Sequence, residues 1–189
     1  MASDRCESGH PPSEWIDHQG GPPMSASSAQ ILEMLRGLRF LSGVGDEALK
    51  TIASVAELRE VPADSVIFRE GQSNSHIYLV VSGAVALEIR LTGREAKRIQ
   101  TVGPGELLGW SPVLGQISMT ATGRSVGPTR LIAVDGTQLA TLCEHDPKFG
   151  YEFMKRTAMA LATRLSATRL QLLDVYGQQL PAAAPGQEV

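Results

Sequence analysis

The sequence predicts an α+β fold: an antiparallel sheet, rolled or sandwiched, flanked by N-terminal helices and a long C-terminal helix. Three observations support this prediction. Short β-branched runs between Val66 and Arg124 are separated at regular intervals by glycine turns, a pattern typical of antiparallel rolls and sandwiches. Apolar residues recur at helical spacing before this stretch. After it, Asp146-Pro147 opens a long helical pattern.

Two short helices are expected ahead of the sheet. Ser27 or Ser28 can cap the first helix, and Gly45-Asp46 opens the second. Each helix has one apolar face that should pack against the core. The residues expected on these faces are Ile31, Met34, Leu35 and Leu38 in the first helix and Leu49, Ile52 and Val55 in the second.

The β-branched runs predict seven strands. They span residues 58–61, 65–68, 76–81, 84–91, 97–102, 117–124 and 130–134. Thr92-Gly93-Arg94 is a hairpin turn signal. After the fifth strand a Gly-Glu pair leads into what resembles a single helical turn, whose free N–H groups would suit an anion. Asp135-Gly136 starts a short helix that contains Leu139 and Leu142.

A long helix is predicted over residues 147–176, capped by Asp146, begun by Pro147 and ended by Gly177. Its apolar residues fall on the a and d positions of a heptad: Met154, Ala158, Leu161, Leu165, Leu172 and Val175, with Thr168 as the polar member. This stripe predicts a homodimer seam, and the alternative is that it packs on its own sheet. Three arginines off the stripe, Arg156, Arg164 and Arg169, are expected to face solvent or to pair across the seam.

Length and composition exclude several classes of protein. A chain of 189 residues with 42% apolar content is expected to form one domain with its own core. The net charge of −3 gives no basic footprint for nucleic acid. Cys6 and Cys143 lie far apart and show no metal-ligand spacing. No apolar run approaches the length of a membrane span, and the N-terminus does not read as a signal peptide, so we expect a cytoplasmic protein without membrane contact.

Both ends of the chain differ in composition from the middle. Residues 1–28 are rich in Gly, Pro and Ser and predict a disordered tail, and residues 177–189 predict a second one. The domain is therefore expected at 29–176. Met24 is a second plausible start, so residues 1–23 are a candidate translation-start artefact.

The central segment resembles the cyclic nucleotide-binding domain, the regulatory β-roll of catabolite-activator-type regulators, cyclic-nucleotide-dependent kinases and gated channels. The matching pieces are Phe68 with Glu70-Gly71, Ile77-Tyr78-Leu79-Val80 with Ser82-Gly83, Gly103, and the cassette start Gly105-Glu106-Leu107. The resemblance covers roughly residues 31–176. It implies an antiparallel β-roll, a jelly-roll-like double-stranded β-helix, whose ligand is a cyclic nucleotide such as cAMP or cGMP.

The resemblance also implies a ligand site, at Gly105, Glu106, Leu107, Leu108, Met119, Thr120, Ala121 and Thr168. In the family a glutamate accepts the ribose 2′-hydroxyl, and Glu106 stands at that position; the alternative is that Glu106 only caps the short helix. The family's phosphate-binding arginine falls on Met119, which cannot supply a charged fork. Arg124 is offset to the other face of the strand and is expected to make a structural contact.

Two further residues have two interpretations each. Thr168 can meet the purine edge, as the matching threonine does in the family, or it can donate to a carbonyl of its own helix. Trp110 can stack on a ligand or fill the site with apolar surface, under a loop formed by residues 111–115.

The resemblance and the residues together favour a stand-alone sensor that binds a cyclic nucleotide or related anion and signals through its C-terminal helix to an unidentified protein partner. The alternative is a pseudo-sensor, a dimeric scaffold that binds no nucleotide. No nucleophile motif accompanies His76 or His145, so we expect no enzyme, no catalytic residues and no metal site. Too few residues follow the long helix for a helix-turn-helix, so direct DNA binding is not expected.

Overall fold

The computed structural model describes residues 26–90, 96–115 and 118–177, with the backbone alone for 171–177. Most of the predicted tails at 1–28 and 177–189, the hairpin turn at 92–94 and the side chains of Leu172 and Val175 lie outside this description.

The N-terminal helices begin at the predicted residues. Helix α1 is Ser28–Gly37, and Ser27 caps it: its hydroxyl accepts from Gln30 N, and the Gln30 side chain accepts from Ser27 N. A short 3-10 helix, η1, follows at Arg39–Leu41, and α2 is Asp46–Val55. The prediction that Val55 faces the core is wrong, because α2 ends there and the side chain is exposed.

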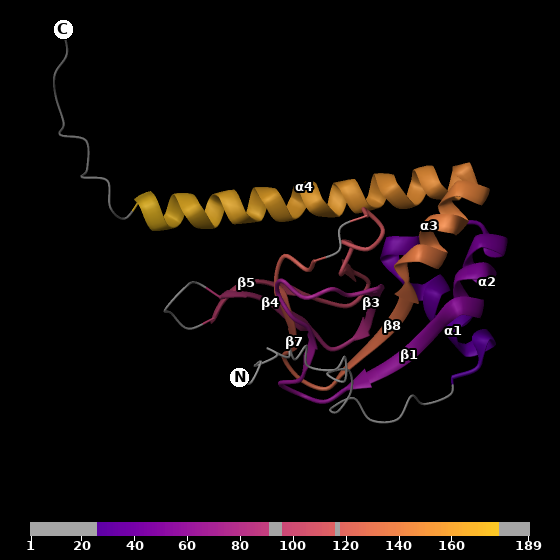
Figure 1. The fold of residues 1–189 in the computed structure, drawn as a ribbon, viewed down its shortest axis with the longest axis horizontal. Coiled ribbons are helices and arrows are strands. Elements are labelled where there is room, and N and C mark those ends of the chain that lie inside the picture. Colours follow the sequence, from indigo (N-terminus) through magenta and orange to yellow (C-terminus); the bar gives the residue numbers. More distant parts are fainter. Residues whose placement is uncertain (1–25, 91–95, 116–117, 178–189) are drawn as a thin grey trace, which may run out of the picture.

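In the described residues, eight strands form two antiparallel four-stranded sheets, and most of these strands are labelled in Figure 1. The strands are β1 Ala56–Val61, β2 Val66–Phe68, β3 His76–Ser82, β4 Val85–Arg90, β5 Ala96–Val102, β6 Leu107–Leu108, β7 Thr122–Ser125 and β8 Thr129–Asp135. One sheet has the order β1-β8-β3-β6, and the other has the order β2-β7-β4-β5. The predicted α+β fold, an antiparallel β-roll with N-terminal helices and a long C-terminal helix, is confirmed.

The first sheet is covered on both faces, which explains its unbroken apolar runs. Alternate side chains of a strand point to opposite faces. In β3, Ile77 and Leu79 pack toward the helices, whereas Tyr78 and Val80 pack between the two sheets. We call these two packed groups the helix-side cluster and the inner cluster. The same alternation places Leu107 in the helix-side cluster and its neighbour Leu108 in the inner cluster.

Two C-terminal helices complete the fold. Helix α3 is Gly136–His145, and the Asp135 carboxylate caps it by accepting from Thr137 N and Gln138 N. Helix α4 is Pro147–Gly177, and it crosses the roll as one long helix whose first turns lie next to α3 (Figure 1). Phe149 and Phe153 fix this first part of α4 in the helix-side cluster. Within the described residues, no helix combines the length and apolarity of a membrane span.

Candidate ligand-binding site

The segment that the sequence predicts as a helical turn is a tight turn followed by a strand. We call residues 103–108 the cassette turn. Gly105 has φ +77°, a backbone conformation that residues other than glycine rarely adopt. Its N–H donates to Val80 O at 2.8 Å, and Val80 N donates back to Glu106 O at 3.1 Å. Leu107 and Leu108 then pair with β3 as β6, so burial against the sheet overrides helix formation here.

The Glu106 carboxylate accepts a backbone hydrogen bond inside this turn. Its Oε2 accepts a hydrogen bond from Gly103 N at 2.7 Å, and the side chain is half-buried. This contact matches the capping interpretation, although the group capped is a turn rather than a helix. The bond fixes the direction of the carboxylate beside β6, and a role of Glu106 toward a ligand hydroxyl remains a prediction.

Met119 belongs to the core of the roll. Its side chain is 5% exposed and packs in the inner cluster. The backbone is held on both sides, since Met119 N donates to Gln72 O at 2.9 Å and Gly71 N donates to Met119 O at 2.8 Å. The next residue, Thr120, is exposed, and Ala121 is buried beside Met119 in the inner cluster. At position 119, which the sequence analysis aligns with the family's arginine, this chain therefore has an apolar core residue.

Arg124, the nearest arginine in sequence, makes the structural contacts that the sequence favours. Its Nε lies 3.3 Å from Glu88 Oε2, and its Nη1 donates to Asp64 O at 2.8 Å. These contacts tie β7 to β4 and to the loop before β2.

Trp110 lies on the helix side of the first sheet. It packs against the helix-side cluster, not the inner cluster that holds Met119. The chain makes one helical turn directly after it, because Leu114 N donates to Trp110 O at 3.3 Å. The helical turn that the sequence predicts at Leu107 is therefore found a few residues later.

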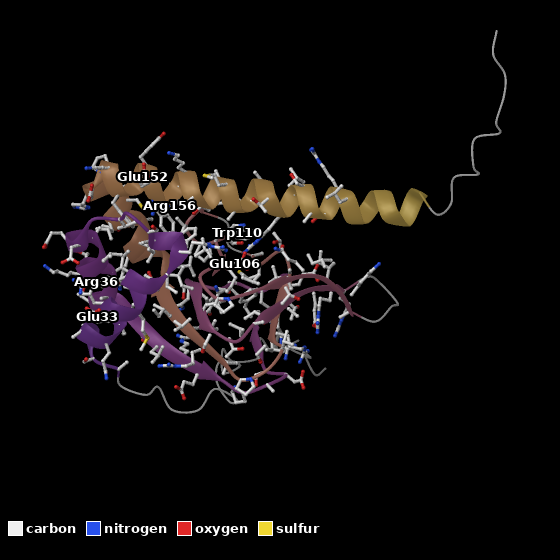
Figure 2. The ribbon with its side chains drawn as sticks, turned by 180° about the vertical axis from the view of Figure 1, so that it is seen from behind. Glu33, Arg36, Glu106, Trp110, Glu152 and Arg156 are labelled. Carbon is white, nitrogen blue, oxygen red and sulfur yellow. The ribbon has the colours of Figure 1, made fainter. Side chains whose placement is uncertain are left out.

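Arg164 of α4 reaches the cassette turn, and sequence reasoning placed it wrongly in solvent or across a dimer seam. Its side chain is 9% exposed. Nη2 donates to the Leu107 carbonyl oxygen, and the guanidinium carbon lies 4.4 Å from the centre of the Trp110 ring. Desolvation lowers the pKa of Arg164 to about 10, and the nearby charge of Glu106 opposes this shift. Figure 2 shows Glu106 and Trp110 beneath α4.

Of the eight predicted site residues, the structure groups some and separates others. Glu106 and Leu107 lie where Arg164 meets the cassette turn, and Gly105 precedes them in the same turn. Leu108, Met119 and Ala121 lie in the inner cluster. Thr168 Oγ1 donates to Arg164 O at 2.9 Å, as its second interpretation predicts.

A spacing in the sequence could have located Arg164. Phe149, Phe153 and Thr157 are buried at intervals of four residues, and Arg164 lies two turns further along the same face of α4. The heptad stripe lies beside this face, so the heptad pattern does not predict that Arg164 is buried.

His76, at the start of β3, is a histidine whose surroundings shift its pKa. Burial, helped by the charge of Arg59, lowers its pKa below 6.5, against the opposing charges of Asp135 and Glu57. The unfolded chain therefore binds a proton at this residue more readily than the folded protein, so stability falls as the pH drops below about 6.5. We expect the variant His76→Gln to lose less stability between about pH 6.5 and pH 5 than wild type, measured by urea unfolding. Parallel stability profiles of the two proteins would contradict this assignment.

Comparison with known proteins places this geometry in a family. Residues 58–146 match the family described as "Cyclic nucleotide-binding domain". A solved structure from Geobacter metallireducens, of a protein described as cyclic nucleotide-binding, is 30% identical with a TM-score of 0.61 and covers 70% of this chain and 96% of its own.

Two curated relatives are longer than this chain. The cyclic AMP receptor protein of Thermus thermophilus is 28% identical over 138 residues, which are 73% of this chain and 62% of the relative. A protein of Rhodopseudomonas palustris described as a potassium channel is 27% identical over 127 residues, 67% of this chain and 30% of the relative. The chain spans less than two thirds of the length of either relative. On these matches and on its fold, the chain belongs to the cyclic nucleotide-binding domain family.

Proposed function

We propose that this domain is a regulatory sensor, not an enzyme, that binds a cyclic nucleotide, cAMP or cGMP, or a related small anion at the cassette turn. It passes the bound state through α4 to a partner protein. The observation that carries the proposal is the contact of Arg164 with the Leu107 carbonyl and the Trp110 ring. Through it, a residue in the middle of the long helix is tied to the segment that holds ligand in this family.

The packing of α4 suits a helix that changes its position. Phe149 and Phe153 anchor its N-terminal part in the core, and Arg164 is the last side chain buried among those described. Residues 165–170 beyond it are all exposed. A ligand that changes the cassette turn would therefore shift the far half of the helix, provided that it binds one helix position more tightly than the other.

The exposed stripe on α4 favours a homodimer. Met154 is 38% exposed and Leu165 54% exposed, and Ala158 between them is exposed too. Leu161 is half-buried, so most but not all of the described apolar members of the stripe lie away from their own sheet, which favours the seam over the alternative interpretation. Apolar a and d positions without cover are what a second α4 would bury.

A second candidate function, the pseudo-sensor, is favoured by Met119 alone. An apolar side chain fills the place of the family's phosphate-binding arginine and is packed in the inner cluster. In this version the domain is a dimeric scaffold, and the contact between α4 and the cassette turn is fixed.

Hydrogen exchange of the whole protein distinguishes the two candidates. The sensor is expected to change amide protection in the cassette turn and in the part of α4 around Arg164 when cAMP or cGMP is added. The pseudo-sensor is expected to show the same exchange with and without either nucleotide.

A further inference from the structure

Arg164 is a buried cation without a described acidic partner. Within the described residues its Nη1 has no hydrogen-bond partner, and no carboxylate oxygen lies within 4.0 Å of its nitrogens. A guanidinium has five N–H donors. The described hydrogen bond uses Nη2 alone, toward the Leu107 carbonyl. Arg164 therefore has unused N–H donors at a place from which water is largely excluded.

This arrangement would lower the stability of the folded protein if Arg164 had only a structural role. A buried charge is tolerated when an opposite charge or several hydrogen bonds compensate it. Burial lowers the pKa of Arg164 to about 10, so the group still carries its proton at pH 7. The Trp110 ring, 4.4 Å away, provides partial compensation through its negative face.

We propose that Arg164 is the anion-binding group of this site and takes the phosphate of the ligand in place of the arginine that position 119 lacks. This inference rests on the proposed function and names the charge that the proposed sensor uses. The phosphate would lie on the α4 side of the cassette turn, next to Leu107 and Trp110, and not among the inner cluster with Met119. The packing of Met119 then presents no obstacle to binding.

The surroundings of Arg164 also indicate the class of anion. Arginine binds phosphate through two parallel hydrogen bonds, and Nη1 is available for one of them. Glu106 is close enough to influence the pKa of Arg164, so it would repel a second negative charge on the ligand. The site therefore favours a monoanionic phosphodiester, as in a cyclic nucleotide, over a phosphomonoester that carries nearly two charges at pH 7.

The test is calorimetric titration of the full chain with cAMP, cGMP, AMP and uncharged adenosine. We expect wild type to bind a cyclic nucleotide more tightly than AMP or adenosine. Arg164→Gln should weaken that binding about 10- to 150-fold, the range for one hydrogen-bonded charge. Arg164→Lys keeps the charge but loses the fork, so its loss should be smaller. Arg156→Gln is the matched control, because Arg156 is a partly buried arginine of α4 that bonds Phe40 O and Glu152 instead.

A spectroscopic readout locates the anion independently. In a Trp15→Phe background Trp110 is the sole tryptophan, so its fluorescence reports on the ring beneath Arg164. Cyclic nucleotide should change this fluorescence, and Arg164→Gln should abolish the change while circular dichroism shows a folded protein. If Arg164→Gln fails to fold, Arg164→Lys is the test variant. An affinity of Arg164→Lys for cyclic nucleotide equal to that of wild type would then refute the proposal.

These outcomes distinguish the role of Arg164 from the sensor function of the domain. Equal affinity of wild type and Arg164→Gln for the cyclic nucleotide would overturn the role of Arg164 and leave the sensor intact. Absence of binding by wild type would overturn both the sensor and this inference.

Discussion

Replacing Met119 with arginine should lower the free energy of unfolding by about 3–5 kcal/mol, because it buries a charge that has no partner. The methionine is 5% exposed and packs among apolar side chains of both sheets. The other buried members of this inner cluster are Phe68, Tyr78, Val80, Val85, Leu87, Val102, Leu108, Ala121, Leu131 and Ala133. The loss would be a large part of the stability of a small domain, which is typically about 5–15 kcal/mol. Urea unfolding followed by circular dichroism measures it.

Met119→Leu is the matched control for this change. It conserves volume and apolar character, so it should cost less than about 1.5 kcal/mol. A stable Met119→Arg protein that also gains affinity for cAMP or cGMP would contradict the placement of Met119 in the core. It would favour a phosphate site in the interior of the roll.

Replacing Leu165 with glutamate should convert the proposed dimer into a monomer. Leu165 is 54% exposed in the single chain, so a charge there costs the monomer little. In a seam between two α4 helices the same charge would be buried in both copies. We expect the dimer dissociation constant to rise about 100-fold or more, which corresponds to about 2.7 kcal/mol. Light scattering over a dilution series measures the change.

Thr163→Glu is the control for the seam. Thr163 is exposed, lies off the heptad stripe and donates to Met159 O in its own helix. The same charge at this position should leave the assembly state unchanged. Equal dissociation of both variants, or a wild type that is monomeric at high concentration, would refute the seam.

The sequence was sufficient to predict the helices and strands whose residues carry a recognisable pattern. The unbroken apolar run within residues 76–81 predicts β3, and both sets of alternate residues are apolar because the first sheet is buried on both faces. Strand β6 was missed because its two residues are too short to show a period. Its existence depends on pairing with β3, which lies far away in the sequence.

The candidate site was only partly predictable for a similar reason. Resemblance to the family identified Glu106 and the substitution at Met119, since both follow from alignment of short motifs. It could not show that Met119 is packed against both sheets, because that depends on tertiary contacts. Arg164 was missed because a heptad describes one face of a helix, and this residue lies on the neighbouring face beside Phe153 and Thr157.

The most direct test of the central claim, that the cassette turn and α4 respond together to ligand, is hydrogen exchange of the wild-type protein with and without cyclic nucleotide. Mass spectrometry of peptides that cover residues 103–111 and 157–168 would report both segments in one experiment, with adenosine as the uncharged control. The account predicts that cAMP or cGMP changes protection in both segments and that adenosine changes neither. Unchanged exchange in both segments at saturating cyclic nucleotide, or a change in the cassette turn alone, would contradict it.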